Sequence, residues 1–235
     1  MRTLIADLVV EIPEVGDLVS QCENYMYYGE RGADVVIRTD LLERAGLANL
    51  TKDQRIYLLS GTGFYGELLR FNGIMLHASA VEYNGKAYLF SANSGVGKST
   101  HTQIWQREFG FSARVFNDDK PALRYVDGRW YAYGTPWCGK DGININCKVP
   151  VAGICFLKQS PKNSIRRLSK QEAITNLIAQ TLRGFGQIGM VDLMVKQLDR
   201  LIQDIPVFEL ENRPEPEAAW LSYETMNRAA KELGL

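Results

Sequence analysis

Hydrophobic and polar residues follow two different periods along this chain, and the change of period separates the expected strands from the expected helices. Near the N-terminus, TLIADLVVEI and DVVIR are short and rich in β-branched residues, so each is predicted to be a strand. From Thr51 to about Phe71, apolar residues recur at helical spacing behind a threonine that can cap a helix. Gly61, Gly63 and Gly66 weaken this helix, because glycine is a poor helix former.

Two β-hairpins are the clearest local features of the sequence. HASAVEYNGKAYLFSA is expected to turn at Asn84-Gly85, and ALRYVDGRWYAYG at Asp127-Gly128. Asn-Gly and Asp-Gly suit a two-residue type I′ turn, in which both residues take positive φ. Between the hairpins, residues 99–109 are predicted to form a helix that is closed by the glycine after it.

The rest of the chain is predicted to hold two strands and three helices. PVAGICFL is typical of a buried strand, and PVFEL of a late one. SKQEAITNLIAQTLR opens with Ser169 and Glu172 at the spacing of a capping box, and residues 190–203 form a second helix. The terminal helix, PEPEAAWLSYETMNRAAKEL, has Pro216 near its first turn. We therefore expect an α/β fold with a mixed sheet, hairpins on one side of it and helices on the other.

A single domain is expected over residues 1–235, since no linker, repeat or low-complexity tract divides the chain. Hydrophobic residues make up 46% of the sequence, which is enough to bury a core. The expected nucleotide-binding core covers about residues 74–160. N-terminal strands and a helix precede it over 1–73, and C-terminal helices follow it over 169–235.

Composition makes several classes of protein improbable. Lys+Arg and Asp+Glu both count 27, so the chain lacks the basic excess that is usual in nucleic-acid-binding proteins. Asp7 interrupts the first apolar run, which argues against an export signal, and VAGICFL is too short to cross a membrane. The four cysteines form no CxxC pair and there are only two histidines, so no zinc site is expected. We expect a cytoplasmic protein with reduced thiols that binds neither nucleic acid nor membrane.

The segment LFSANSGVGKST carries the strongest chemical signal. It matches the P-loop (Walker A) pattern GxxxxGK[ST] with Ala92 in the place of the first glycine. In such a loop, backbone N–H groups converge on an anion, and the positive end of the following helix favours phosphate. Gly95 and Gly97 permit the backbone angles that this requires. Lys98 is expected to reach the β- and γ-phosphates, and the Ser99 hydroxyl to bind Mg²⁺.

An acidic pair, Asp118-Asp119, follows Lys98 by 20 residues. Two features argue against an ordinary P-loop NTPase. The acidic residues come early, and the strand before the loop is the second arm of a hairpin, whereas such NTPases use a mostly parallel sheet with crossover helices.

HASAVEYNGKAYLFSANSGVGKST followed by VFNDD resembles the catalytic domain of HPr kinase/phosphorylase, a family that shares its nucleotide fold with phosphoenolpyruvate carboxykinase. The resemblance is strongest over residues 76–120. YGTPWCGK and the C-terminal helices are similar to those of a wider group of HPr kinase-like proteins. The resemblance implies a single-domain P-loop protein with a mixed, hairpin-containing sheet of this type, and ATP and Mg²⁺ as its ligands.

The same resemblance implies roles for individual residues. One of Asp118 and Asp119 would bind Mg²⁺ together with Ser99, and the other would accept the proton of an attacking hydroxyl. The preferred assignment is Asp118 as the base and Asp119 as the metal ligand. His77 would lie near the acidic pair and the transferred phosphate. The residues expected to surround the phosphates are Asn93, Ser94, Gly95, Val96, Gly97, Lys98, Ser99 and Thr100.

Two further segments are candidates for weaker roles. YGTPWCGKDGININCK, residues 133–148, could close over the nucleotide or shape an acceptor pocket, with Lys140 neutralising a phosphate and Arg124 or Arg183 as weaker alternatives. Cys138 has no histidine nearby in sequence and is not expected to be a nucleophile. GTGFYG matches GxGxxG, but no strand precedes it, so its small residues are expected to let a helix pack closely.

The chain also departs from the family. KSTHTQ lacks the glutamate that HPr kinases carry after the serine, and neither their N-terminal domain nor their glycine- and arginine-rich docking segment is recognisable. HPr as acceptor and the reverse phosphorolysis are therefore not carried over.

The hypothesis from sequence is an Mg-ATP-dependent kinase that moves the γ-phosphoryl group to a hydroxyl of a protein, a peptide or a small molecule. Two alternatives stay open: a non-catalytic nucleotide-binding sensor or interaction module, and an ATPase or GTPase. The sequence also leaves open the acceptor, the preferred purine and whether the protein forms a homo-oligomer.

Overall fold

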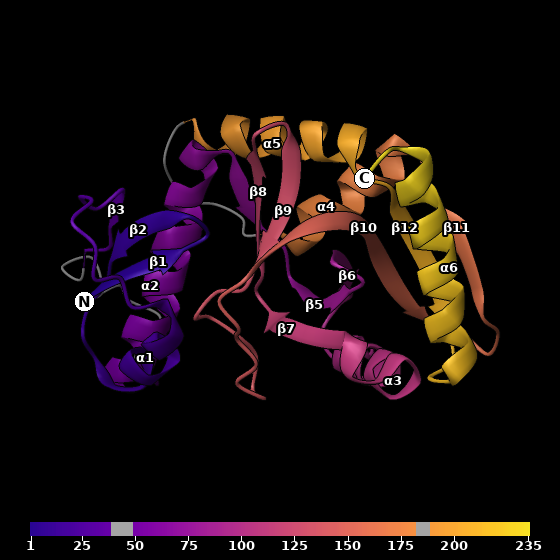
Figure 1. The fold of residues 1–235 in the computed structure, drawn as a ribbon, viewed down its shortest axis with the longest axis horizontal. Coiled ribbons are helices and arrows are strands. Elements are labelled where there is room, and N and C mark those ends of the chain that lie inside the picture. Colours follow the sequence, from indigo (N-terminus) through magenta and orange to yellow (C-terminus); the bar gives the residue numbers. More distant parts are fainter. Residues whose placement is uncertain (39–48, 182–188) are drawn as a thin grey trace.

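A computed structural model describes residues 1–38, 49–181 and 189–235. Within these ranges, nine strands form one mixed sheet (Figure 1). Seven of them follow one another in the order β4 (Gly73–Met75), β8 (Ala122–Val126), β9 (Arg129–Tyr133), β10 (Lys148–Gln159), β6 (Lys86–Ser91), β5 (Ala78–Tyr83) and β7 (Ala113–Asp119). The later part of β10 also pairs with β12 (Val207–Asn212), which in turn pairs with β11 (Ser164–Arg167). The mixed sheet expected from the sequence is confirmed.

Both predicted hairpins are present. Asn84 and Gly85 connect β5 to β6 with φ of 51° and 71°. Asp127 and Gly128 connect β8 to β9 with φ of 49° and 81°. The turns therefore have the positive φ angles that a type I′ turn requires.

Strand β5 brings the ends of β6 and β7 to the same edge of the sheet. Both β6 and β7 are antiparallel to β5, so they run in the same direction. Ala78 at the start of β5 is paired with Ser91 at the end of β6 and also with Asp119 at the end of β7. Because adjacent strands are about 4.8 Å apart, the ends of β6 and β7 lie roughly 10 Å from each other.

The helices agree with the sequence pattern at most of their boundaries. They are α1 (Gly16–Gln21), α2 (Lys52–Leu68), α3 (Lys98–Phe109), α4 (Lys170–Gln180), α5 (Met190–Asp204) and α6 (Pro216–Glu232), with short 3₁₀ turns at Glu23–Tyr25, Leu69–Phe71 and Gly110–Ser112. Thr51 with Gln54 and Ser169 with Glu172 form complete capping boxes, and Pro216 opens the terminal helix. The last two residues of SKQEAITNLIAQTLR, Leu182 and Arg183, lie outside the described residues.

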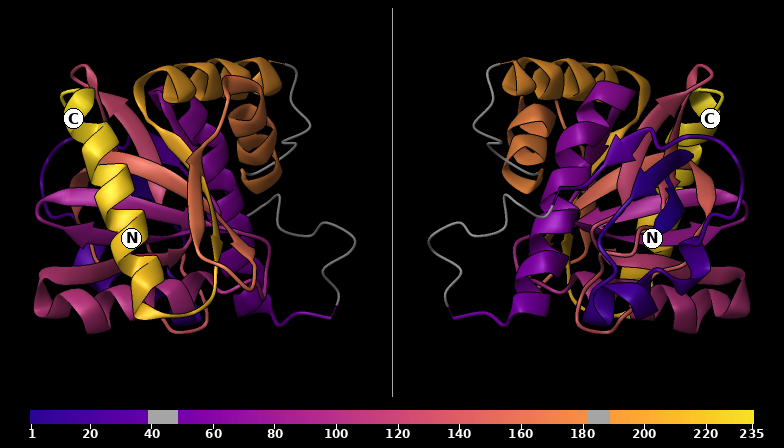
Figure 2. Two further views of the ribbon diagram at one scale, coloured as in Figure 1. Left: turned by 90° about the vertical axis from the view of Figure 1, so that its right-hand side faces the viewer. Right: turned by 90° about the vertical axis from the view of Figure 1, so that its left-hand side faces the viewer.

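Helices cover both faces of the sheet, so the expectation of hairpins on one side and helices on the other is wrong. In the left view of Figure 2, α5 lies across the top and α3 along the bottom, with strands between them. Strand β10 shows the reason, because its apolar residues point to both faces, as is usual for strands with parallel neighbours on either side. On one face Val151, Ile154 and Phe156 pack with residues of α4 and α5. On the other face Ala152, Cys155 and Leu157 pack with residues of α3 and α6.

The N-terminal segment forms a smaller unit, drawn in indigo in Figure 1. TLIADLVVEI is not one strand but two, β1 (Arg2–Ile5) and β2 (Leu8–Glu11), because Ala6 and Asp7 take positive φ and reverse the chain. The two strands pair with each other, and β2 pairs with β3 (Val35–Val36). This small sheet shares a hydrophobic cluster with α1, α2 and Trp137 of the 133–148 loop.

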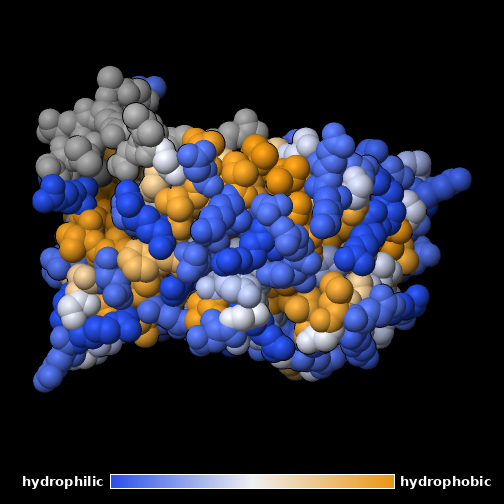
Figure 3. Space-filling model, turned by 90° about the horizontal axis from the view of Figure 1, so that it is seen from above, coloured by the Kyte–Doolittle hydropathy of each residue, from blue (hydrophilic) through white to orange (hydrophobic). Residues whose placement is uncertain are grey.

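The surface seen from above is mainly hydrophilic, with small separate apolar areas (Figure 3). On α5, Val191 and Val195 are exposed. In the part of the chain that the structure describes, no helix has the length and apolar character needed to span a membrane.

The GTGFYG segment lies inside α2, where its first glycine permits close packing. A Cβ atom at Gly61 would lie 2.9 Å from Cδ1 of Trp137. The Trp137 ring cannot easily move away, because it stacks on Phe64 at 5.1 Å and its indole N–H donates to Ser60 Oγ at 3.1 Å. The expected structural role of the glycines is therefore confirmed at this position.

We predict that Gly61→Ala destabilises the protein by about 1–3 kcal/mol, because Trp137 must shift from a well-packed position. Gly63→Ala is the matched control in the same helix, since its Cβ would lie 3.4 Å from the flexible end of Ile37. The control should be neutral or up to about 1 kcal/mol stabilising, through helix propensity. Urea unfolding measures both, and equal effects of the two substitutions would contradict the packing explanation.

Candidate active site

The loop from Ala92 to Gly97 connects the end of β6 to the start of α3. Gly95 and Gly97 take φ of 82° and 118°, which other residues rarely adopt. Helix α3 begins at Lys98 without a side-chain cap, so no side chain of the loop satisfies its first N–H groups. An uncapped helix N-terminus favours negative charge nearby.

Lys98 folds back over this loop. Its Nζ donates to the carbonyl oxygen of Ala92 at 3.1 Å. Burial lowers the pKa of Lys98 from its usual value, while the charges of Asp119 and Asp118 act in the opposite direction. The ammonium group therefore lies within the electrostatic influence of the acidic pair.

Asp118 contacts the loop directly. The Ser99 hydroxyl donates to Asp118 Oδ2 at 3.0 Å. The aspartate is only 7% exposed, and its other oxygen, Oδ1, is buried with no hydrogen-bond partner among the described residues. Since buried carboxylate oxygens are normally satisfied, this oxygen marks a position where a cation or a donor is expected.

Asp119 has a different set of neighbours. Its Oδ1 lies 2.7 Å from His77 Nε2, and its Oδ2 lies 3.0 Å from Lys120 Nζ. The hydrogen bond with His77, together with the charge of Lys120, holds the pKa of Asp119 well below its usual range, although burial acts in the opposite direction. The carboxyl group is therefore ionised at neutral pH. The two aspartates are adjacent in sequence, yet only Asp118 contacts Ser99.

A chain of side chains links Asp119 back to the loop. His77 Nδ1 lies 2.9 Å from Gln180 Oε1, and Gln180 Nε2 donates to Asn93 Oδ1 at 2.7 Å. The expectation that His77 lies near the acidic pair is met by this geometry. Gln180, at the end of α4, was not predicted, because nothing in its local sequence indicates that α4 ends beside His77.

The 133–148 loop lies against the acidic pair. The N–H of Gly139 donates to the carbonyl oxygen of Asp118 at 2.7 Å, and a Cβ at Gly139 would lie 3.3 Å from Asp118 Oδ2. Lys140 is exposed and lines a cavity of about 570 Å³ that also includes Asp119 and Lys120. Lys140 is thus close to the acidic pair but does not line the cavity beside the loop from Ala92 to Gly97.

Of the remaining candidates, Arg124 is held away from the site. Arg124 donates to the backbone oxygens of Phe71 and Ala6, on the side of the N-terminal unit. Arg183 lies outside the described residues. Burial raises the pKa of the Cys138 thiol, which disfavours the thiolate that a nucleophile would need.

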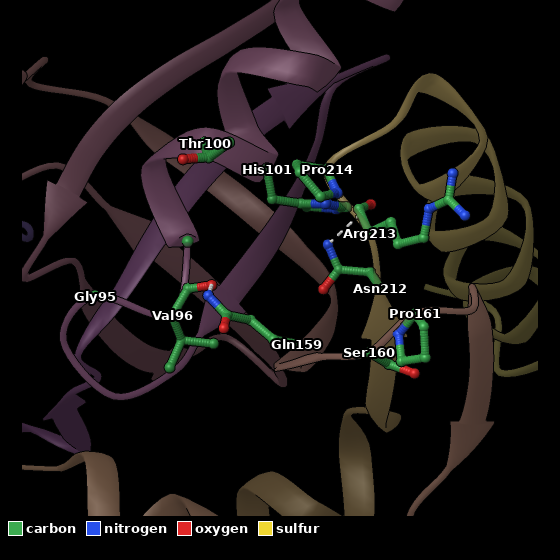
Figure 4. Close-up of a pocket in the computed structure, with 11 residues that line it drawn as sticks. Gly95, Val96, Thr100, His101, Gln159, Ser160, Pro161, Asn212, Arg213 and Pro214 are labelled. Carbon is green, nitrogen blue, oxygen red and sulfur yellow. Dashed lines mark hydrogen bonds between the residues drawn. The ribbon is translucent and has the colours of Figure 1, made fainter.

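A cavity of about 540 Å³ borders the loop on the side of α3 (Figure 4). It lies at the carboxyl ends of the parallel strands β10 and β12, where α/β sheets commonly bind ligands. Gln159 donates to the carbonyl oxygen of Val96 at 3.2 Å, and Asn212 and His101 also line the cavity. His101 is 1% exposed, and its Nδ1 has no hydrogen-bond partner among the described residues. These three polar residues were not predicted from the sequence.

Comparisons with known proteins identify no family for the chain. No family model matches it, and no curated protein matches it. Among solved structures, it is similar to the HPr(Ser) kinase/phosphatase from Coxiella burnetii, with a TM-score of 0.39 and 10% identity over 68% of this chain and 93% of that one. The similarity is a distant structural one, and it assigns no role to any residue.

We predict a pH dependence of stability from His101. Burial lowers the pKa of His101 from 6.5 to about 3, so between these values the unfolded chain binds a proton that the folded chain does not. The free energy of unfolding should therefore decrease as the pH falls below 6.5, by up to about 1.4 kcal/mol per pH unit.

His101→Gln removes this contribution. Urea unfolding of both proteins at pH 7, 6 and 5 measures the effect. The stability advantage of the wild type should shrink by about 1–2 kcal/mol between pH 7 and pH 5. An advantage that stays constant over this range would contradict the prediction.

Proposed function

We propose that this protein is a magnesium-dependent kinase that binds ATP on the loop between β6 and α3 and transfers the γ-phosphoryl group to the hydroxyl of an acceptor. The observation that carries the proposal is the 3.0 Å hydrogen bond between Ser99 and Asp118. It joins the phosphate-loop motif to the acidic pair, and phosphoryl transfer needs these two elements together: donors that hold the phosphates and carboxylates that position a metal and a nucleophile.

The polyphosphate is assigned to the start of α3. The uncapped N–H groups of this helix and the positive end of its dipole favour negative charge. Lys98 would move from the carbonyl oxygen of Ala92 to a phosphate oxygen, exchanging a neutral acceptor for a charged one. The open space around Gly95 leaves room for the phosphate chain to approach the backbone.

Ser99 and Asp118 fit a magnesium ion. Hydroxyl and carboxylate oxygens are hard ligands, and the unpartnered Oδ1 of Asp118 offers one more. The described residues hold no group of three or more histidines, cysteines or acids that could bind a metal. Magnesium in nucleotide sites does not need such a group, because phosphate and water complete its coordination. When bound, it would neutralise charge on the phosphates.

Asp119 is assigned to the acceptor hydroxyl. Its contacts favour the reverse of the preference drawn from the sequence, since Asp118 contacts Ser99 while Asp119 lines the 570 Å³ cavity. In the transfer step, the acceptor oxygen forms a bond to the γ-phosphorus and the bond to the bridging oxygen breaks, leaving ADP with the electron pair. The hydroxyl proton passes to Asp119, and His77 positions that carboxylate.

The nucleoside is assigned to the cavity beside α3. This cavity adjoins Gly95, Val96 and Gly97, so a nucleoside in it remains connected to phosphates on the loop. The amides of Gln159 and Asn212 offer both donors and acceptors to a base or a ribose. Its volume of about 540 Å³ lies in the usual range of small-molecule sites.

The two aspartates should have separable effects. Asp118→Asn should raise the Mg²⁺ concentration needed for half-maximal ATP turnover, while Asp119→Asn should lower kcat by about 100-fold or more and leave that concentration unchanged. Lys98→Ala should lower kcat by a similar factor. Asp127→Asn, in the β8–β9 turn, is the control and should behave as wild type. Turnover that is insensitive to Lys98→Ala would refute the proposed site.

The nucleoside cavity can be tested separately from the phosphate loop. Asn212→Leu should weaken ATP binding by about tenfold through the loss of one hydrogen-bonding group. Binding of inorganic tripolyphosphate, which has no nucleoside, should be unchanged. Calorimetric titration with Mg²⁺ present measures both, and equal weakening of the two ligands would argue against a nucleoside in this cavity.

A further inference from the structure

We propose that the cavity lined by Asp119 is the acceptor site, and that its acceptor is a small hydroxy amino acid, with a hydroxyl, an ammonium and a carboxylate group. This inference rests on the proposed function, because it takes Asp119 as the group that meets the acceptor hydroxyl. We call this space the acceptor cavity. Its volume is about 570 Å³, which suits a small molecule.

The N-terminal unit supplies most of the wall of the acceptor cavity. Asp17 and Gln21 come from α1, and Gln54 and Tyr57 from α2. The opposite wall is the 133–148 loop with Lys140. The N-terminal part of the chain thus borders the expected acceptor position.

Hydrogen bonds hold the two walls together. The Tyr57 hydroxyl donates to the carbonyl oxygen of Cys138 at 3.3 Å and accepts from its N–H at 2.9 Å. Asn144 of the loop donates to Gln21 of α1. These contacts fix the shape of the cavity before any acceptor enters, which lowers the entropy cost of binding.

The charges around the acceptor cavity indicate the chemistry of its occupant. Four charged side chains line it: Asp17, Asp119, Lys120 and Lys140. Lys120 and Asp119 form an ion pair at 3.0 Å. Among the described residues, neither Asp17 nor Lys140 has an ion-pair partner, so one negative and one positive group are available. A zwitterion matches this pair, with its ammonium at Asp17 and its carboxylate at Lys140.

The hydroxyl of the same molecule then faces Asp119. Its oxygen bonds to the γ-phosphorus of ATP, the bond from that phosphorus to the bridging oxygen breaks, and ADP retains the electron pair. The hydroxyl proton passes to Asp119. The products are ADP and an O-phospho amino acid, so no further reactant is needed.

The test uses the full chain with Mg-ATP and three probes: L-serine, L-threonine and L-homoserine. At least one should become phosphorylated, as followed by ³¹P NMR. For serine, ethanolamine lacks the carboxylate and 3-hydroxypropionate lacks the ammonium. For homoserine, the matched pair is 3-amino-1-propanol and 4-hydroxybutyrate. The kcat/KM for each analogue should be at least about tenfold lower than the kcat/KM for the corresponding amino acid.

Two variants assign the charges. Lys140→Gln and Asp17→Asn should each raise KM for the amino acid by about tenfold. Lys140→Gln should also remove the preference for the carboxylate, and Asp17→Asn the preference for the ammonium, which loss of folding alone would not do. Lys231→Gln on α6 and Asp192→Asn on α5 are exposed controls. An increase of KM for ATP in Lys140→Gln would overturn the assignment of this lysine to the acceptor.

Failure of this inference differs from failure of the proposed function. If ATP binds and is slowly hydrolysed in a manner that depends on Lys98, but none of the three amino acids is phosphorylated, the acceptor assignment is wrong and the nucleotide site stands. If ATP does not bind, both the acceptor assignment and the proposed function are wrong. Equal use of an amino acid and its two analogues would also overturn the zwitterion assignment.

Discussion

The pairing of Ala78 with both Ser91 and Asp119 is the constraint on which the candidate site depends. Strand β5 is antiparallel to both of its neighbours, so β6 and β7 end at the same edge of the sheet, one strand apart. The loop from Ala92 to Gly97 leaves the first of these ends, and the acidic pair forms the second. His77 precedes Ala78 directly and therefore reaches the same edge. In a parallel sheet, a crossover helix brings two strand ends to the same edge. Here the antiparallel pairing of β5 with both neighbours does so.

Some features of this edge of the sheet follow from local sequence signals. The loop glycines, Lys98 and Ser99 are contiguous, so the roles that the sequence predicts for them rest on local backbone chemistry. The hairpin turn at Asn84-Gly85 is also a local signal, and it brings β5 beside β6. The capping boxes of α2 and α4 are of the same kind, since each is set by residues three positions apart.

The features that the sequence did not predict depend on contacts between distant segments. Gln180 reaches His77 across 103 residues, and Asn212 and Gln159 share a cavity only because β12 pairs with β10. The prediction that helices cover only one side of the sheet was wrong for a similar reason. Strand β10 is apolar on both faces, and its sequence pattern alone does not tell how many faces helices will cover. The break at Ala6 and Asp7 was missed because neither residue is a glycine, although both take positive φ.

The backbone geometry of Asp119 is maintained by hydrogen bonds of a neighbouring residue. It has a φ of 91°, a conformation that costs on the order of 1–3 kcal/mol for a residue with a side chain. Asn117 stabilises the turn: its Oδ1 accepts from the N–H of Lys120 at 3.1 Å, and its amide donates to Thr135 at 3.0 Å. The turn is thereby tied to the 133–148 loop.

The N-terminal unit is coupled to the acidic pair through this same loop. Trp137 stacks on Phe64 of α2, and two residues later Gly139 bonds to the backbone of Asp118. Helix α2 and the backbone of Asp118 therefore contact the same short segment of the loop. Under the proposed function, the unit borders the acceptor cavity, while the nucleotide binds the loop from Ala92 to Gly97. Acceptor choice and nucleotide binding are in this way assigned to different parts of one chain.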